Sequence, residues 1–109
     1  MYLYILNGKD EGKRISLKSG TFRIGRAPEN DIVIRNDKYV SGSHAEITLK
    51  GGGKLTLADK GSRNGTYLLG EPVSDHAEVK HGDIFRVGRT FLKYSRRTHE
   101  RIFADDSST

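Results

Sequence analysis

Short runs of alternating apolar and polar residues are the feature that most limits how this chain can fold. Turn-forming Gly, Pro, Asn and Asp residues interrupt these runs from one end of the sequence to the other. A two-residue period is typical of strands with one buried face, whereas helices need apolar residues three and four positions apart. Helix signals are nearly absent. We therefore predict an all-β fold, a β-sandwich of about eleven short, mainly antiparallel strands. The clearest runs are 2–6, 14–17, 21–24, 31–34, 45–49, 54–58, 66–68, 71–73, 83–87 and 90–94.

Alternation also predicts which side chains fill the space between the two sheets. The candidates are apolar residues that recur at every second position within a run. Gly88-Arg89 separates two such runs and predicts a two-residue hairpin turn. The predicted core comprises Ile15, Leu17, Phe22, Ile24, Ile32, Ile34, Ile47, Leu49, Leu55, Leu57, Ile84, Val87, Leu92 and Tyr94.

The length of 109 residues predicts one domain, which we place at residues 1–95. Residues 96–109 lose the alternation, so we expect a polar linker or tail that leads to another domain of a longer protein. The chain has no cysteine and no apolar run of membrane-spanning length. A cytoplasmic location and no membrane partner are the expectation.

Lys and Arg exceed Asp and Glu by 19 to 14, which gives a net charge of +5. A basic domain favours anionic partners such as nucleic acid, anionic lipid or phosphorylated protein. The same excess can serve only to keep the surface soluble. Charge alone therefore does not choose among these possibilities.

Three polar clusters fall between the predicted strands and are therefore expected on loops. They are Gly25-Arg26, Ser41-Gly42-Ser43-His44 and Gly61-Ser62-Arg63-Asn64-Gly65-Thr66. Together they supply a guanidinium, hydroxyl groups, an amide and glycines that permit tight turns. A guanidinium can hold a phosphate through two parallel hydrogen bonds. This set suits the binding of an anionic group without its chemical conversion.

Several other chemistries fit the sequence poorly. Residues 8–14 differ from a P-loop in spacing and lack its magnesium-binding Ser or Thr. The four histidines do not form a metal-binding pattern, so we expect no metal and no cofactor. A hydrolase that uses Ser41 or Ser43 with His44 remains an alternative, although no nucleophile-elbow motif is present. Basic and aromatic neighbours such as Phe85-Arg86 would lie on opposite strand faces, which disfavours stacking on nucleic acid.

Five motifs in this order resemble the forkhead-associated (FHA) domain family. They are residues 22–26 (FRIGR), 30–34 (NDIVI), 40–47 (VSGSHAEI), 57–68 (LADKGSRNGTYL) and 81–88 (HGDIFRVG), and the match extends from about residue 2 to 95. The resemblance implies an eleven-stranded β-sandwich whose loops at one end bind phosphothreonine peptides. It also implies a signalling module without catalytic activity.

The resemblance implies a role for each matching residue. Arg26 would hold the phosphate, Ser41 would donate its hydroxyl to it, and Asn64 would hold the peptide backbone. Gly42, where the family often has a basic or amide side chain, offers only its N–H, and Lys38 or Arg63 could compensate. Lys38 and Tyr39 are the candidates for setting specificity, and Tyr39 would read the residue three places after the phosphothreonine. The residues expected to shape the loops beneath the site are Gly25, His44 and Gly65.

We therefore predict a non-enzymatic phosphothreonine reader that takes part in Ser/Thr kinase signalling through protein–protein interaction. Two alternatives stay open. One is a degenerate scaffold that binds an unphosphorylated protein, or DNA, through its basic face. The other is the Ser/His hydrolase.

Overall fold

The computed structural model describes residues 1–96, and within them it forms eleven β-strands and one short 3₁₀ turn, η1 (Gly51–Gly53). The predicted fold class is confirmed. Residues 97–109, which make up nearly all of the expected tail, lie outside the described residues. The strands are β1 (Tyr2–Ile5), β2 (Arg14–Ser16), β3 (Gly20–Gly25), β4 (Ile32–Val33), β5 (Ala45–Leu49), β6 (Leu55–Asp59), β7 (Thr66–Leu68), β8 (Glu71–Pro72), β9 (His76–Val79), β10 (Ile84–Val87) and β11 (Thr90–Ser95).

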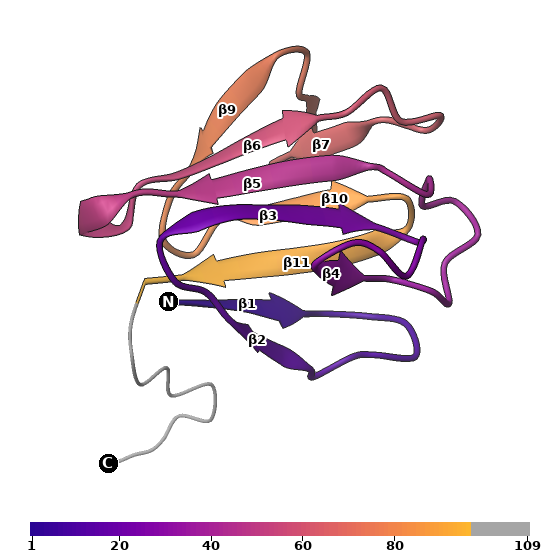
Figure 1. The fold of residues 1–109 in the computed structure, drawn as a ribbon, viewed down its shortest axis with the longest axis horizontal. Helices are drawn as coiled ribbons and strands as arrows, with labels where there is room; N and C mark the ends of the chain where they lie inside the picture. Colours follow the sequence, from indigo (N-terminus) through magenta and orange to yellow (C-terminus); the bar gives the residue numbers. More distant parts are fainter. Residues whose placement is uncertain (97–109) are drawn as a thin grey trace.

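Two sheets pack face to face as a sandwich (Figure 1). The six-stranded sheet has the order β2-β1-β11-β10-β7-β8, and the five-stranded sheet has the order β4-β3-β5-β6-β9. Every strand pair is antiparallel except β3 with β4, which run parallel. A parallel neighbour cannot follow directly by a tight hairpin. The connection of residues 26–31 therefore turns back beside β3 before β4 begins, and the Asp31 carboxylate accepts from the N–H of Arg23.

The core consists of the inward-facing side chains of both sheets. Most of the predicted core residues are buried, while Ile15 and Phe22 are half-buried and pack against the cluster. The prediction for Ile84 is wrong, because this side chain is 37% exposed and its neighbour Phe85 points inward instead. Val87 is buried, and only a residue two positions away can share its face of the strand.

Strand β9 was not among the runs identified from the sequence. It pairs with β6 in the register Leu55 with Val79 and Leu57 with Ala77. Its sequence, His-Ala-Glu-Val, offers only two apolar residues, of which one is Ala, so the two-residue period is too short to stand out.

Five connections gather at one end of the sandwich, the right-hand end in Figure 1. They join β1 to β2, β3 to β4, β4 to β5, β6 to β7 and β10 to β11. All three polar clusters of the sequence lie in these connections or at their borders. Within residues 1–96, no helical segment has the length and hydropathy that crossing a bilayer requires.

Candidate functional site

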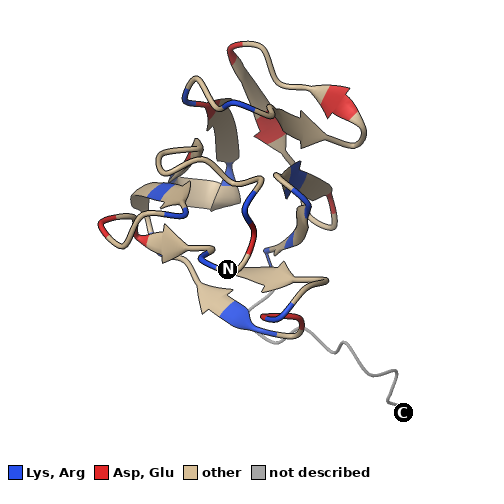
Figure 2. Ribbon diagram, turned by 90° about the vertical axis from the view of Figure 1, so that its right-hand side faces the viewer, with Lys and Arg blue, Asp and Glu red and all other residues tan. Residues whose placement is uncertain are grey.

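A hollow of 130 Å³ opens at the loop end, and we call it the phosphate hollow. Figure 2 looks onto this end and shows Lys and Arg positions on several of the surrounding loops. All seven residues predicted to bind or to read the ligand line the hollow, together with Val40. The lining contains three cationic side chains and no carboxylate. It is formed by Arg26, residues 38–42, Arg63 and Asn64.

The side chain of Arg26 is exposed but held in place at one atom. Its Nε donates a hydrogen bond to the carbonyl of Val40 at 3.1 Å. The planar guanidinium keeps two terminal nitrogens at a fixed angle to that bond. These nitrogens can therefore donate two parallel hydrogen bonds to one anion.

Main-chain hydrogen bonds join the β3–β4 loop to the β4–β5 loop beside the hollow. The N–H of Arg26 donates to the carbonyl of Ser41 at 3.0 Å, and the N–H of Ala27 donates to that of Gly42 at 3.2 Å. The side-chain amide of Asn30 donates to the same Gly42 carbonyl at 2.6 Å. Gly25 is buried where the loops meet, and a β-carbon there would lie 2.2 Å from this carbonyl oxygen. Only glycine allows the two loops to approach this closely.

His44 is fully buried and connects two loops through its ring. The N–H of Ser41 donates to Nδ1 at 2.9 Å, and Nε2 lies 2.9 Å from the carbonyl of Gly65. Because Nδ1 accepts, Nε2 carries the proton and donates. Both nitrogens are bonded to main-chain groups, so the ring has no free nitrogen to activate a serine hydroxyl. This arrangement opposes the hydrolase alternative.

Ser41 and Asn64 are each bonded to the neighbouring loop while keeping groups for a ligand. The Ser41 hydroxyl oxygen accepts from the N–H of Arg63 at 3.0 Å, which leaves its own proton to donate. The Asn64 Nδ2 donates to the carbonyl of Tyr39 at 2.9 Å. The carbonyl oxygen of the Asn64 amide and the second N–H hydrogen stay available for a peptide backbone.

Asp59, which was not among the predicted site residues, organises the β6–β7 loop. Its carboxylate accepts hydrogen bonds from the N–H groups of Gly61 and Ser62 and from the hydroxyls of Ser62 and Thr66. The Ser62 hydroxyl in turn accepts from the N–H of Gly65 at 2.9 Å, which fixes the turn that presents Asn64. Burial raises the pKa of Asp59, but the hydrogen bonds from Ser62, Thr66 and Gly61 outweigh it and hold this pKa below its usual value.

We expect Asp59→Asn to lower the free energy of unfolding by about 2 kcal/mol at pH 7, because an amide nitrogen cannot accept the N–H and O–H bonds. A carboxyl whose pKa is lowered by folding stabilises the protein above its unfolded pKa of about 4, and this stabilisation is lost as the pH falls through the folded pKa. The difference between the two proteins should therefore shrink below about pH 4. Urea unfolding at pH 7 and pH 3 measures it.

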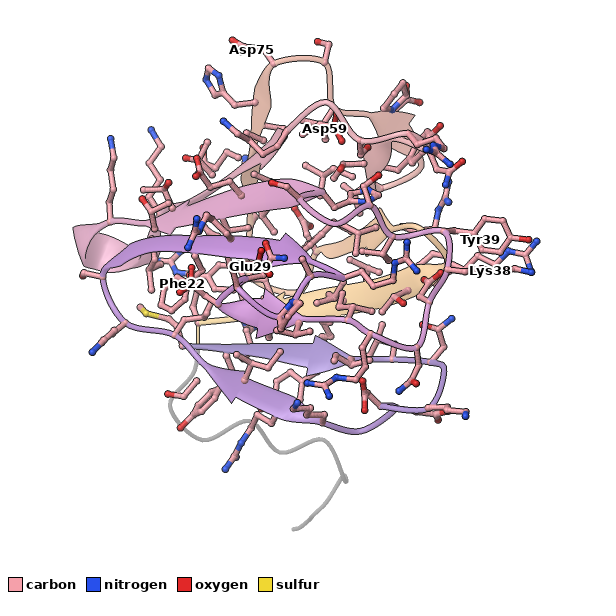
Figure 3. All side chains as sticks on the ribbon, turned by 45° about the vertical axis from the view of Figure 1, so that its right-hand side comes forward. Phe22, Glu29, Lys38, Tyr39, Asp59 and Asp75 are labelled. Atoms are coloured by element: carbon pink, nitrogen blue, oxygen red, sulfur yellow. The ribbon has the colours of Figure 1, made fainter. Side chains whose placement is uncertain are left out.

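Asp75→Asn is the matched control, since the Asp75 side chain is 91% exposed at the top of Figure 3 and its contact is with the neighbouring His76. Its effect should stay within about 0.5 kcal/mol at both pH values. Equal losses in the two variants would show that the Asp59 hydrogen bonds do not stabilise the loop.

Asp37 was also missed by the sequence analysis, and it positions Tyr39. One carboxylate oxygen accepts from the N–H of Tyr39 at 2.9 Å, and the other accepts from the N–H of Arg89 and the hydroxyl of Thr90, both at 2.7 Å. The Arg89 guanidinium carbon lies 4.1 Å from the centre of the Tyr39 ring. The bond from the Tyr39 N–H has a local sequence signal, because an Asp often accepts from the N–H two residues later in a turn. The bonds from Arg89 and Thr90 span 52 and 53 residues and have no local sequence signal.

A second hollow of 370 Å³ continues from the first, and we call it the flanking groove. Lys38 and Tyr39 line both hollows, and they lie side by side at the outer edge of the loop end in Figure 3. The lining of the groove also includes the charged residues Lys9, Asp10 and Arg89. Two buried core residues, Ile5 and Ile34, line it as well.

The sequence model of the protein family named FHA domain matches residues 22–88 of this chain. Among curated proteins, the chain is similar to the glycogen accumulation regulator GarA of Mycolicibacterium smegmatis, with 40% identity over 84% of this chain and 56% of that protein. It is also similar to the FHA domain-containing protein FhaB of Mycobacterium tuberculosis, with 35% identity over 84% of this chain and 58% of that protein. The chain thus spans little more than half the length of these relatives.

Solved structures share the fold as well. One, from a study of phosphothreonine-dependent FHA domain interactions, has a TM-score of 0.79 and 28% identity, and covers 90% of this chain and 97% of its own. Another is EmbR of Mycobacterium tuberculosis in complex with a low-affinity phosphopeptide, with a TM-score of 0.79 and 26% identity, which covers 92% of this chain and 25% of its own.

Proposed function

This chain belongs to the forkhead-associated (FHA) domain family, and on that premise we propose that it binds phosphothreonine-containing proteins or peptides as a non-catalytic signalling module. The observation that supports this proposal most directly is the phosphate hollow. Its three cations and absence of carboxylates match an anionic ligand. The hydrogen bonds that fix its walls prepare it for binding without rearrangement.

In this proposal Arg26 binds the phosphate with its two terminal nitrogens. Ser41 donates its hydroxyl to the same group, and the Gly42 N–H adds a donor. Arg63 and Lys38 supply further positive charge at the rim of the hollow. Asn64 binds the peptide backbone next to the phosphothreonine. A phosphothreonine carries a charge of about −1.5 to −2 and three acceptor oxygens, so it can use all these donors together.

The flanking groove would take peptide residues beside the phosphothreonine. Lys9, Lys38 and Arg89 give its walls three positive charges. Asp10 and Asp37 also line the groove, so three positive charges face two negative ones, and the Asp37 carboxylate is already hydrogen-bonded to three protein groups. We therefore propose that an acidic residue is preferred at a flanking position and that Tyr39 contacts it. Residues 1–95 would form the binding unit, acting in the cytoplasm on the product of a Ser/Thr kinase.

The test is the binding of an oriented phosphothreonine peptide library, with unphosphorylated and phosphoserine libraries as controls. Selective binding of the phosphothreonine library, with Asp or Glu enriched at one flanking position, would support the proposal. Binding that ignores the phosphate would favour the scaffold alternative. Hydrolysis of an ester substrate that is lost in His44→Ala, with the fold shown to be intact by circular dichroism, would favour the hydrolase.

Gly42→Lys should tighten phosphopeptide binding about three-fold, because it adds a cation where this chain has only an N–H. A β-carbon at Gly42 would have one neighbour, the Ala27 β-carbon at 3.8 Å, so the side chain fits without strain. An exposed charge pair is worth up to about 1 kcal/mol, which sets the size of the gain. Isothermal titration with one phosphopeptide measures it, and Gly42→Gln is the uncharged control. Unchanged affinity would place the phosphate away from residue 42.

A further inference from the structure

Four large apolar side chains are exposed among the described residues, and all lie on or beside the outer surface of the six-stranded sheet. They are Leu6 (36% exposed), Leu69 (65%), Ile84 (37%) and Phe91 (41%). Leu6 donates its N–H to the carbonyl of Phe91, and Leu69 donates to that of Ile84, so they form two neighbouring pairs. Tyr67 of β7 and Arg86 of β10 are paired across their two strands and lie between these two pairs. We call the six residues together the apolar face.

The outer surface of the five-stranded sheet is different in composition. Its central strands β3, β5 and β6 present Thr21, Arg23, Glu46, Thr48 and Thr56, and the Thr21 and Thr48 hydroxyl oxygens lie 3.2 Å apart. Exposed apolar residues are ordinary when scattered, whereas a contiguous group is typical of an interaction surface. The four exposed apolar residues are concentrated on the six-stranded sheet, and the outer surface of that sheet is therefore the candidate interaction surface.

The charge of the apolar face is positive. The guanidinium carbon of Arg86 lies 4.2 Å from the ring centre of Tyr67 and 6.0 Å from that of Phe91, and its NH1 donates to the Gly88 carbonyl at 2.8 Å. At the other side of the sheet, Arg14 lies over the Tyr2 ring at 4.6 Å. The outward positions of the four central strands β1, β11, β10 and β7 hold two cations, Arg86 and Lys93, and no carboxylate. Two copies of this chain packed through the face would bring like charges together, whereas an acidic partner complements it.

The apolar face is continuous with the proposed peptide site. A β-carbon on Gly65, next to Asn64, would lie 3.1 Å from the Tyr67 ring. At the other edge, Asn7 lines the flanking groove, accepts from the N–H of Phe91 at 2.8 Å, and donates to the carbonyl of Arg89 at 2.8 Å. A chain that leaves either hollow therefore reaches the apolar face directly.

We propose that the apolar face is a second docking surface for the phosphorylated partner, and that it binds a segment in which carboxylates alternate with apolar side chains. This inference rests on the proposed function, since the phosphothreonine anchors the same partner chain in the hollow. A tethered second contact is favoured by its high effective concentration, so a modest surface adds measurable affinity. An extended segment advances about 3.3 Å per residue, and twelve residues therefore suffice to cross the sheet.

The experiment uses display libraries of a fixed phosphothreonine anchor peptide with twelve randomised residues added before or after it. Selected peptides are measured against the whole chain, against the double variant Ile84→Thr with Arg86→Gln, and against a control double variant on the opposite sheet, Thr56→Ser with Glu78→Gln. We expect Asp or Glu to alternate with apolar residues in the selected extensions, and a gain of about ten-fold over the anchor alone. The gain should disappear in the Ile84/Arg86 variant and persist in the control.

The short anchor should bind all three proteins equally, and this arm reports on the proposed function by itself. Failure of the anchor to bind would overturn both proposals. Normal binding of the anchor, with no gain from any extension or with a gain that survives in the Ile84/Arg86 variant, would overturn only the second docking surface. Sedimentation of a wild-type dimer that the Ile84/Arg86 variant abolishes would also overturn it, as would binding to phosphatidylserine vesicles that the same variant abolishes.

Discussion

Arg26→Ala should weaken phosphothreonine-peptide binding by about 100-fold or more, which corresponds to about 3 kcal/mol. Hydrogen bonds to a charged group contribute about 1.5–3 kcal/mol each, and the guanidinium can form two of them with one phosphate. Lysine at this position would restore the charge but not the paired geometry, so Arg26→Lys should recover only a part of the loss. Isothermal titration with a single phosphopeptide of known sequence measures all three proteins.

The matched control is Arg23→Ala, which removes the same side chain three residues earlier on β3. Arg23 lies on the outer surface of the five-stranded sheet, where its Nε is 3.8 Å from the Asp31 carboxylate and more than half of its side chain is exposed. A surface ion pair of this kind contributes little, so the phosphopeptide affinity should change less than about two-fold. Retained binding in Arg26→Ala, or equal losses in both variants, would mean that the anion is bound elsewhere.

Much of the fold could be predicted because alternation is a local property. Strands β5 and β7 begin and end where their sequence pattern does, and the Gly88-Arg89 turn joins β10 to β11 as expected. The face of a strand is harder to assign where two apolar residues are adjacent. Ile84 and Phe85 are such a pair, and only the requirement that Val87 share a face with the inward residue decides between them.

The candidate site could be predicted for residues that lie in recognisable motifs. The hydrogen-bond partners that hold those residues could not. Arg26 is fixed by a main-chain carbonyl 14 residues away, and Asp37 bonds to Arg89 across 52 residues. A carbonyl carries no sequence signature, and pairing between distant loops depends on the finished fold. Sequence therefore indicates which groups can meet a ligand, whereas structure is needed to say what keeps them rigid.

Gly25→Ala should remove the site and lower the free energy of unfolding by about 3 kcal/mol, the upper part of the range for overpacking a buried position. The added β-carbon would lie 2.2 Å from the Gly42 carbonyl oxygen, a main-chain atom that cannot turn away as a side chain can. The β4–β5 loop would have to move, which breaks the two main-chain bonds to Arg26 and Ala27. Arg26 would then lose its position relative to Ser41, and phosphopeptide binding should fall below detection.

Gly42→Ala is the matched control. It adds the same β-carbon to the glycine whose carbonyl oxygen lies against Gly25. Gly42 is exposed, its φ is not in the left-handed region, and a β-carbon there meets only the Ala27 β-carbon at an ordinary 3.8 Å. The alanine keeps the N–H, so stability should change by less than about 0.5 kcal/mol and affinity should be nearly unchanged. Urea unfolding and peptide titration are measured on Gly25→Ala and on Gly42→Ala. They distinguish the loss of the close approach between the loops from a general effect of replacing a glycine by alanine. Wild-type stability and binding in Gly25→Ala would show that the loops tolerate separation and that their close approach is not what builds the site.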